Sequence, residues 1–383
     1  MKKLLLLPLF FISVAIVSQV DFLQLGADID GEAAGDLSGS SVSMNAAGDR
    51  VAIGASINNN GNGVNAGHVR IYDWNGTAWT QLGTDIDGEA ANDRSGSSVS
   101  MNAAGDRVAI GAFGNGVNAG HVRIYDWNGT AWTQLGTDID GEAAGDLSGS
   151  SVSMNATGDR VAIGAWVNSG NALNAGHVRI YQWYGTTWAQ LGSDIDGEAV
   201  GDRSGFSVSM NASGDRVGIG ATKNDGPVFV QSGHVRIYDW NGTAWTQLGS
   251  DIDGEAAGDS NGWSVSLSSD GNTVAIGATE NDGNTGNFSD NRGHVRIYKG
   301  GPSVSITEVS TQINIYPNPT NEEITILIDN FTENIKTEVY DIIGNRLQTT
   351  NKTTISLRNY ARGVYILKVA YGDKVKEVKV IKD

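Results

Sequence analysis

Short runs in which apolar residues alternate with small or polar residues recur along most of this chain. In the first copy the runs are SVSM over residues 41–44, RVAIGA over 50–55, HVRIYDW over 68–74 and AWTQL over 78–82. A side-chain period of two is typical of β-strands, so each copy predicts four short strands.

The connections between these runs predict tight turns. Asn75-Gly76 separates the third and fourth runs and recurs as Asn128-Gly129 and Asn241-Gly242. An Asn-Gly pair between alternating runs predicts a two-residue hairpin in which both turn residues have positive φ. NAAGD over residues 45–49 predicts a second turn, and together the turns predict a four-stranded antiparallel meander.

The meander is a repeat of about 55 residues that occurs five times. Its fixed position is the histidine of GHVRIY, at His68, His121, His177, His234 and His294. Units of this kind bury their faces against one another, and a four-stranded meander repeated radially is a β-propeller blade. The sequence therefore predicts an all-β fold, a five-bladed β-propeller.

The two ends of the repeats predict how the ring closes. DFLQLG over residues 21–26 resembles the fourth run AWTQLG but follows no earlier blade, and the fifth copy ends after residues 294–298 without a fourth run. We therefore expect this N-terminal strand to complete the fifth blade, which removes the open sheet edges.

The rest of the chain divides into a leader, a linker and a tail. Lys2 and Lys3 precede an apolar run over residues 4–17, which predicts a signal peptide over 1–19; an uncleaved anchor is the alternative. The propeller is expected over 20–300, a linker over 301–311 and a separate domain over 312–383. Alternating runs with turns at 343–345 and 371–373 predict a small C-terminal β-sandwich.

Composition narrows the chemistry. The chain has no cysteine, which excludes disulfides and thiolate metal sites. Residues 4–310 hold 14 Lys and Arg against 34 Asp and Glu, whereas residues 311–383 hold 10 against 9. An acidic body argues against nucleic acid as a partner.

Much of the acidity lies between the fourth run of one copy and the first run of the next. Each such segment carries carboxylates at i, i+2, i+4 and i+8 around a glycine, a cluster that resembles the oxygen donors preferred by calcium. The alternative is a solvated turn whose carboxylates cap backbone N–H groups. The predicted metal residues are Asp28, Asp30, Glu32, Asp36, Asp85, Asp87, Glu89, Asp93, Asp138, Asp140, Glu142, Asp146, Asp194, Asp196, Glu198, Asp202, Asp251, Asp253, Glu255 and Asp259.

The segment between the second and third runs varies in length and shares the predicted rim with the acidic segments. Its copies are 56–66, 113–119, 166–175, 222–232 and 279–292, and they are either binding loops or spacers. Phe113, Trp166, Phe229 and Phe288 favour binding. The five histidines occupy equivalent positions, which favours a structural role, and no catalytic motif is found.

Two resemblances add to this interpretation. GWSV over residues 262–265 with DGNTVAIGA over 270–278 resembles the FG-GAP repeats of integrin-α-type propellers, and the resemblance covers residues 21–299. It implies extracellular adhesion or ligand binding. The chain departs from that family in having five blades rather than seven and in a shortened calcium loop.

The tail resembles the type A C-terminal sorting domain of the type IX secretion system of Bacteroidetes over residues 312–383. The resemblance is carried by YPNPT at 316–320, VYDIIGNRL at 339–347 and the ending KVKEVKVIKD. It implies that residues 312–383 engage the secretion machinery and that the protein is secreted or held at the outer-membrane surface.

We therefore expect a non-enzymatic binding or adhesion propeller with an unknown extracellular ligand, a glycan or a protein. The alternatives are a polysaccharide-active hydrolase or lyase on the propeller and a structural surface module without a ligand.

Overall fold

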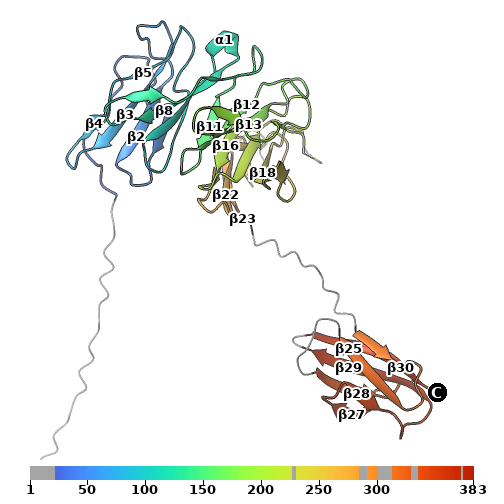
Figure 1. The fold of residues 1–383 in the computed structure, drawn as a ribbon. Coiled ribbons are helices and arrows are strands. Elements are labelled where there is room, and N and C mark those ends of the chain that lie inside the picture. The colour runs from blue at the N-terminus through green and yellow to red at the C-terminus, as the bar shows by residue number, and fades with distance from the viewer. Residues whose placement is uncertain (1–21, 227–229, 284–290, 301–312, 329–334, 372–373) are drawn as a thin grey trace, which may run out of the picture. The chain divides into compact units, whose positions relative to one another are not determined.

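The computed structural model describes residues 22–226, 230–283, 291–300, 313–328, 335–371 and 374–383. These residues form two compact units, one ending at Lys299 and one beginning at Gly300, and the strands account for nearly all regular structure (Figure 1). The predicted signal peptide and the whole of the predicted linker lie outside the described residues.

The first unit is a series of antiparallel sheets, one per sequence repeat. The first four sheets each hold four strands in chain order plus a two-residue fifth strand that pairs with the third. Sheet 1 contains β1 (Ser41–Met44), β2 (Arg50–Ala55), β3 (His68–Trp74), β4 (Trp79–Gln81) and β5 (Ile86–Asp87). Sheet 2 contains β6 (Ser98–Met101), β7 (Arg107–Ala112), β8 (His121–Trp127), β9 (Trp132–Gln134) and β10 (Ile139–Asp140), with the short helix α1 (Asn115–Asn118) between β7 and β8.

The next two sheets repeat this order. Sheet 3 contains β11 (Ser151–Met154), β12 (Arg160–Ala165), β13 (His177–Trp183), β14 (Trp188–Gln190) and β15 (Ile195–Asp196). Sheet 4 contains β16 (Ser204–Met210), β17 (Arg216–Ala221), β18 (His234–Trp240), β19 (Trp245–Gln247) and β20 (Ile252–Asp253). Sheet 5 holds only β21 (Asn261–Leu267), β22 (Thr273–Ala278) and β23 (His294–Lys299).

The four predicted strands are confirmed in the first four repeats, but the hairpin between the third and fourth strands is of another kind. Gly76 has a φ of +96°, whereas Asn75 is not among the residues with positive φ. The Asn75 Oδ1 accepts hydrogen bonds from the backbone N–H groups of Thr77 and Ala78. The loop is therefore an asparagine-stabilised turn over residues 75–78, not the two-residue turn with both residues at positive φ.

The predicted closing strand is not found. Residues 22–26 form no strand, and β23 has no partner on its outer edge in the described part of the chain. The Leu25 carbonyl accepts a hydrogen bond from Trp79 Nε1 of sheet 1 (2.9 Å), just as the Leu82 carbonyl accepts one from Trp132 Nε1 of sheet 2 (3.0 Å). Residues 22–26 thus make the contact that a fourth strand makes with the following sheet, but they do not pair with β23 of sheet 5.

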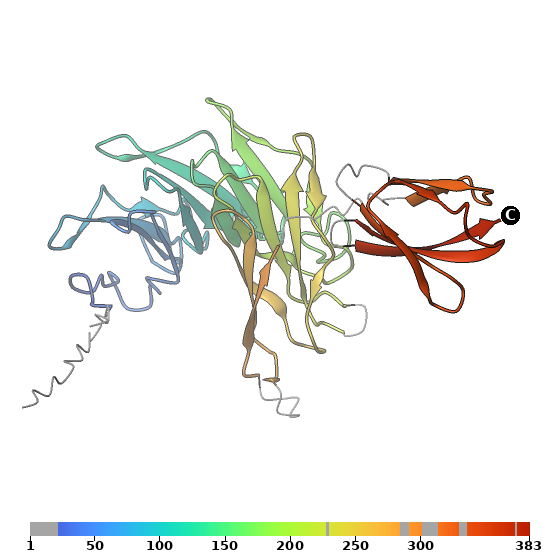
Figure 2. The same cartoon turned by 90° about the horizontal axis from the view of Figure 1, so that it is seen from below.

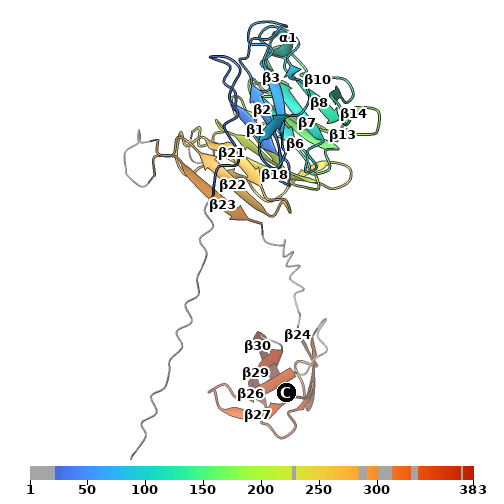
Figure 3. The same cartoon turned by 90° about the vertical axis from the view of Figure 1, so that its left-hand side faces the viewer.

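Each sheet packs against the next in chain order (Figures 2 and 3). Val69 and Ile71 of sheet 1 form one core cluster with Val99 and Met101 of sheet 2, and the later sheets repeat the arrangement. The approach is close at Gly54, where an added Cβ would lie 2.0 Å from the Gly96 carbonyl oxygen of the next sheet.

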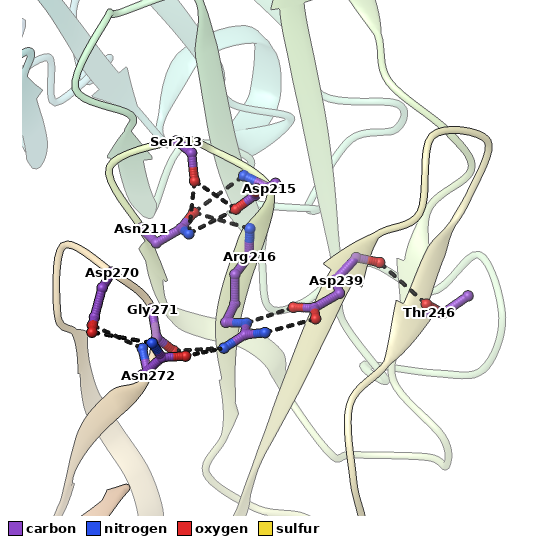
Figure 4. A network of polar contacts seen from close by, with 9 residues as sticks. All are labelled: Asn211, Ser213, Asp215, Arg216, Asp239, Thr246, Asp270, Gly271 and Asn272. Carbon is purple, nitrogen blue, oxygen red and sulfur yellow. Dashed lines mark hydrogen bonds and ion pairs between the residues drawn. The ribbon is translucent and has the colours of Figure 1, made fainter. Parts of the chain in front are cut away.

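An arginine fork ties the second strand of a sheet to the third strand and to the next sheet. Arg216 Nε and Nη2 donate to the two carboxylate oxygens of Asp239 at 2.6 and 2.8 Å, and Nη1 donates to the Gly271 carbonyl of sheet 5 at 3.0 Å (Figure 4). Arg50 and Arg107 make the same contacts. Sheet 5 has Thr273 at the arginine position.

The second unit consists of two sheets around one core. The strands β24 (Ile313–Tyr316), β25 (Glu323–Ile328) and β28 (Thr354–Ser356) form one sheet. The other contains β26 (Ile335–Tyr340), β27 (Arg346–Thr350), β29 (Gly363–Tyr371) and β30 (Lys374–Lys382). Buried residues of both sheets share one hydrophobic cluster, as expected of a β-sandwich.

The YPNPT motif contacts the last strand of this unit. The Asn318 Oδ1 accepts a hydrogen bond from the Ile381 N–H, and Nδ2 donates to the Lys379 carbonyl. Lys382 is buried, and its Nζ donates to the carbonyls of Leu357 and Tyr360. The two ends of the sorting resemblance are thus joined in the fold.

Over the described residues, neither unit has a helix with the length and apolar character needed to cross a membrane.

Candidate functional site

A glutamate, a histidine and an aspartate come together at the start of the third strand in sheets 1 to 4. The histidine follows a glycine with positive φ, such as Gly67 (+74°), and it is buried because the strand runs through the middle of its sheet. The four Glu–His–Asp groups are Glu32/His68/Asp85, Glu89/His121/Asp138, Glu142/His177/Asp194 and Glu198/His234/Asp251.

The carboxylates of one group come from different acidic segments. His68 Nδ1 lies 3.7 Å from Glu32 Oε2, in the segment before sheet 1, and 3.8 Å from Asp85 Oδ2, in the segment after it. The His177 group repeats these contacts, at 3.8 Å to each carboxylate. Each group thus combines carboxylates from two consecutive acidic segments.

An arginine two residues after each histidine neutralises part of the charge. Arg70 Nη1 lies 3.9 Å from Glu32 Oε1, and its Nη2 donates to the Asp30 carbonyl at 2.6 Å. The guanidinium also lies over the ring of Tyr72, with 5.6 Å from Cζ to the ring centre. All five sheets carry this arginine and tyrosine pair.

Burial lowers the pKa of three of these histidines. Desolvation, aided by the positive charge of Arg236, lowers the pKa of His234 to about 4, although Asp251 acts in the opposite direction. Burial also lowers the pKa values of His121 and His177. A neutral imidazole has a free lone pair on one nitrogen, so it can accept a hydrogen bond or bind a metal.

The predicted metal residues fall into four classes with different partners. In the first, Asp28 accepts a hydrogen bond from the Gln24 amide at 2.8 Å. Asp85, Asp138, Asp194 and Asp251 repeat this contact with the glutamine four residues before each. The second class is Asp30, Asp87, Asp140, Asp196 and Asp253, whose carbonyls accept from the arginine of the next sheet.

The other two classes differ in their partners. The third class, Glu32, Glu89, Glu142, Glu198 and Glu255, lies beside that arginine. The fourth is buried and caps its own loop: Asp259 Oδ2 accepts from the N–H groups of Glu255 and Ala256. Asp93 and Asp202 accept from the same two N–H groups, and Asp36 and Asp146 accept from the alanine N–H.

These partners show how well the segments suit a cation. Calcium takes six to eight oxygen ligands, whereas the three donors that lie within 4.8 Å of one another include an imidazole nitrogen. The Asp259-type oxygens already accept backbone hydrogen bonds. The donor set therefore fits calcium poorly, and calcium binding by these segments stays a prediction.

A row of aromatic side chains breaks the symmetry of the repeats. The rings of Trp166 and Phe206 have centres 5.8 Å apart, and those of Phe206 and Trp263 lie 4.8 Å apart. Arg203 Cζ lies 5.0 Å above Trp166 at the other end of the row. We call Trp166, Phe206 and Trp263 the aromatic row.

The aromatic row joins three sheets on the rim formed by the variable loops. Trp166 follows β12, whereas Phe206 lies in β16 and Trp263 in β21. The positions equivalent to Phe206 and Trp263 are serines in the first three repeats: Ser40, Ser97 and Ser150. Sequence reasoning selected Trp166 but missed Phe206, although the exchange of serine for phenylalanine within a repeat was a usable signal.

The other predicted loop aromatics lie elsewhere. Phe113 packs under Arg94, with 5.3 Å from Cζ to the ring centre. Phe229 and Phe288 lie outside the described residues.

Comparison with known proteins identifies the tail. Residues 314–383 match the family model described as the secretion system C-terminal sorting domain. The match indicates export through the type IX secretion system, contact of this domain with that machinery and a cell-surface or extracellular location. It does not include the repeats, so their FG-GAP resemblance stays a prediction.

Comparison with curated proteins gives no match. Among solved structures, a 6-phosphogluconolactonase described as putative, from Bacteroides uniformis, is similar at 9% identity, with a TM-score of 0.48 and 90% of this chain and 86% of that chain covered. The periplasmic gluconolactonase PpgL of Pseudomonas aeruginosa has 12% identity, a TM-score of 0.45 and coverage of 90% and 89%. The β-propeller domain of the Trilobed protease from Pyrococcus furiosus has 10% identity, a TM-score of 0.39 and coverage of 90% and 98%.

Proposed function

We propose that the repeats form a non-enzymatic propeller-type binding module that the sorting domain delivers to the cell surface or the medium, and that its ligand is a glycan. The aromatic row carries this proposal. Four of the five sheets repeat the same buried histidine environment, whereas among the described residues the aromatic row occurs once and places Trp263 in contact with solvent.

The chemistry of the row suits a sugar ring. Aromatic side chains offer a large apolar face that loses little conformational entropy on binding, and the apolar faces of pyranose rings can stack on them. Arg203 at the end of the row adds donors for a hydroxyl or a carboxylate. The acidic body excludes a highly anionic polymer as the preferred ligand.

Substitution to the residue found in the other repeats gives a sharp test. Phe206→Ser and Trp263→Ser place the serine of the first three repeats at these positions, so the fold should be retained. We expect each substitution to weaken glycan binding at least about fivefold, which corresponds to about 1 kcal/mol for a lost stacking contact. A glycan array followed by calorimetry with the bound glycan measures the effect.

Tyr184→Asn is the matched control. Tyr184 is an exposed aromatic residue that replaces the asparagine of the Asn-Gly turn, and it lies on the other rim. Binding that is equal in the wild type and both serine variants would contradict the role of the row.

Release of shorter sugars during the incubation would favour the alternative of a hydrolase or lyase. A titration with millimolar calcium that gives neither heat nor a thermal shift would contradict the calcium prediction.

A further inference from the structure

The two ends of the five-sheet series expose apolar faces to solvent. In sheet 1, Val42 is 63% exposed and Met44 52%, whereas the equivalent Val99 and Met101 of sheet 2 are buried. In sheet 5, Val295 is 66% exposed and Ile297 70%. Repeat proteins usually end in units with a polar outer face, and neither end of this series has one.

These faces are the two halves of an interface that the chain already forms four times. The face of sheet 1 that points away from sheet 2, which we call the front, carries Val42 and Met44, the equivalents of the Val99 and Met101 that pack against sheet 1. The face of sheet 5 that points away from sheet 4, the rear, carries Val295 and Ile297, the equivalents of the Val69 and Ile71 that pack against sheet 2. Polar contacts follow the same rule. Ser41 Oγ donates to the Gly96 carbonyl and Ser43 Oγ accepts from the Met101 N–H.

The corresponding serines of sheet 5, Ser264 and Ser266, are exposed. The arginine contact to the next sheet is the one element not repeated there, since Thr273 replaces the arginine.

The two ends also lack complementary parts of one sheet. In sheet 1, Tyr72 pairs with Gln81 of the fourth strand, and His68 pairs with Asp87 of the fifth. Sheet 5 has neither strand, while residues 22–30 lie on sheet 1 in the positions of a preceding fourth and fifth strand. His294 lies 3.6 Å from Glu255, and the aspartate that would complete its Glu–His–Asp group is equivalent to Asp28.

We propose that copies of this chain associate head to tail, with sheet 5 of one copy packed on sheet 1 of the next. Residues 22–25 of the second copy add the missing fourth strand to β23, and its Asp28 completes the group of His294. Because the two surfaces differ, the interface is heterologous and each added copy leaves another free end.

A mixing experiment tests the proposal on the chain without its predicted leader. The wild type should be larger than a monomer in sedimentation or light scattering. Val42→Asp blocks the front end and Ile297→Asp the rear end, so each variant alone should be monomeric. Mixed in equal amounts, the two should form a species of twice the monomer mass, because each retains the end that the other lacks. Val200→Asp, at an equally exposed valine (68%) away from both ends, should behave as the wild type.

A single methyl group gives a second test with little risk to folding. An added Cβ at Gly164 or Gly220 would lie 2.1 Å from a carbonyl oxygen of the following sheet. At Gly277 the nearest atom is the Ser264 Oγ of its own sheet, at 2.4 Å, and this hydroxyl can turn away by rotation about χ1. Gly277→Ala should therefore keep the melting temperature of the monomer and lose association. Gly61→Ala, where an added Cβ meets nothing within 4 Å, should keep both.

Engineered cysteines separate a second copy from closure of one chain on itself. The register of Tyr72 with Gln81 places Gln24 opposite Tyr298, and the chain has no other cysteine. A Gln24→Cys copy mixed with a Tyr298→Cys copy should give a disulfide-linked dimer. A linked monomer from the chain carrying both substitutions, or a wild type that stays monomeric at all concentrations, would overturn the proposal.

Discussion

His234 shows how burial couples a single side chain to pH. The ring is buried, its pKa is lowered to about 4, and an imidazole in an unfolded chain titrates near 6.5. Below pH 6.5 the unfolded chain therefore binds more protons than the folded chain. The sign follows: the free energy of unfolding loses this contribution as the pH falls from about 6.5 to about 4.

We predict that His234→Gln reduces the acid sensitivity of the protein. Glutamine does not ionise, so up to about 3 kcal/mol of the loss between neutral pH and pH 4 should disappear. Denaturant unfolding at several pH values measures it. Burial raises the pKa values of Asp196 and Glu198, which opposes the histidine in the wild type. Glu198 and Asp251 lie 4.0 and 3.6 Å from the ring nitrogen, so the difference between the two proteins reports the Glu–His–Asp group as a whole. An identical pH profile in the variant would contradict the prediction.

At this scale the sequence could not predict which carboxylates lie next to each histidine. The spacing of Asp28, Asp30, Glu32 and Asp36 within one segment suggested a local cluster. Their distribution depends on strand pairing: Ile86 and Asp87 form a short strand against β3, which turns Asp85 toward His68 while Glu32 approaches the same ring from the preceding segment. Glu32 and Asp85 lie 53 residues apart along the chain, so their meeting at His68 cannot be read from a local period.

At the scale of the elements, the close approach of successive sheets depends on glycine. Gly164 lies in β12, and its Cα faces the Gly205 carbonyl of sheet 4. The Ser151 hydroxyl donates to this same carbonyl at 2.8 Å. A side chain at Gly164 would have to displace backbone rather than the end of a flexible side chain.

We predict that Gly164→Ala destabilises the first unit by about 1–3 kcal/mol, the usual range for overpacking a well-packed core. Gly277→Ala is the matched substitution at the equivalent position of the last sheet, where no following sheet limits the space within the chain. Thermal unfolding of the monomeric proteins compares them. Equal losses in the two variants would mean that the effect arises within a strand and not between sheets.

The strands themselves could be predicted because their periodicity is local. The ranges expected for β1, β2 and β3 agree with the structure, and Asn75-Gly76 does lie in the connection between β3 and β4. The pairing of residues 21–26 with the last sheet could not be decided in this way. Phe22, Leu23 and Gln24 resemble a fourth strand, but a sequence match does not identify the strand edge with which they would pair.

At the scale of the whole molecule, the chain combines two units with separate hydrophobic cores. The repeats bury their residues between consecutive sheets, and the tail buries its own between two sheets of the sandwich. The tail was identifiable from sequence because its motifs lie where the last strand is held, at Asn318 and Lys382. Since the two hydrophobic clusters share no residue in the described part of the chain, removal of the sorting domain should leave the core of the repeats closed.

We predict that deletion of residues 312–383 leaves a folded repeat unit that remains in the periplasm. The deletion removes the domain that matches the sorting family and retains the segment predicted to direct export across the inner membrane. Cell fractionation locates the truncated chain, and its melting temperature compared with that of the first unit in the full chain shows whether the fold is retained. Lys352→Met, an exposed substitution between β27 and β28 and outside the motifs of the sorting resemblance, is the control that should still reach the surface. If the truncated chain is folded and still displayed on the surface, the signal for sorting lies in the repeats. If it no longer melts cooperatively, the two cores depend on each other.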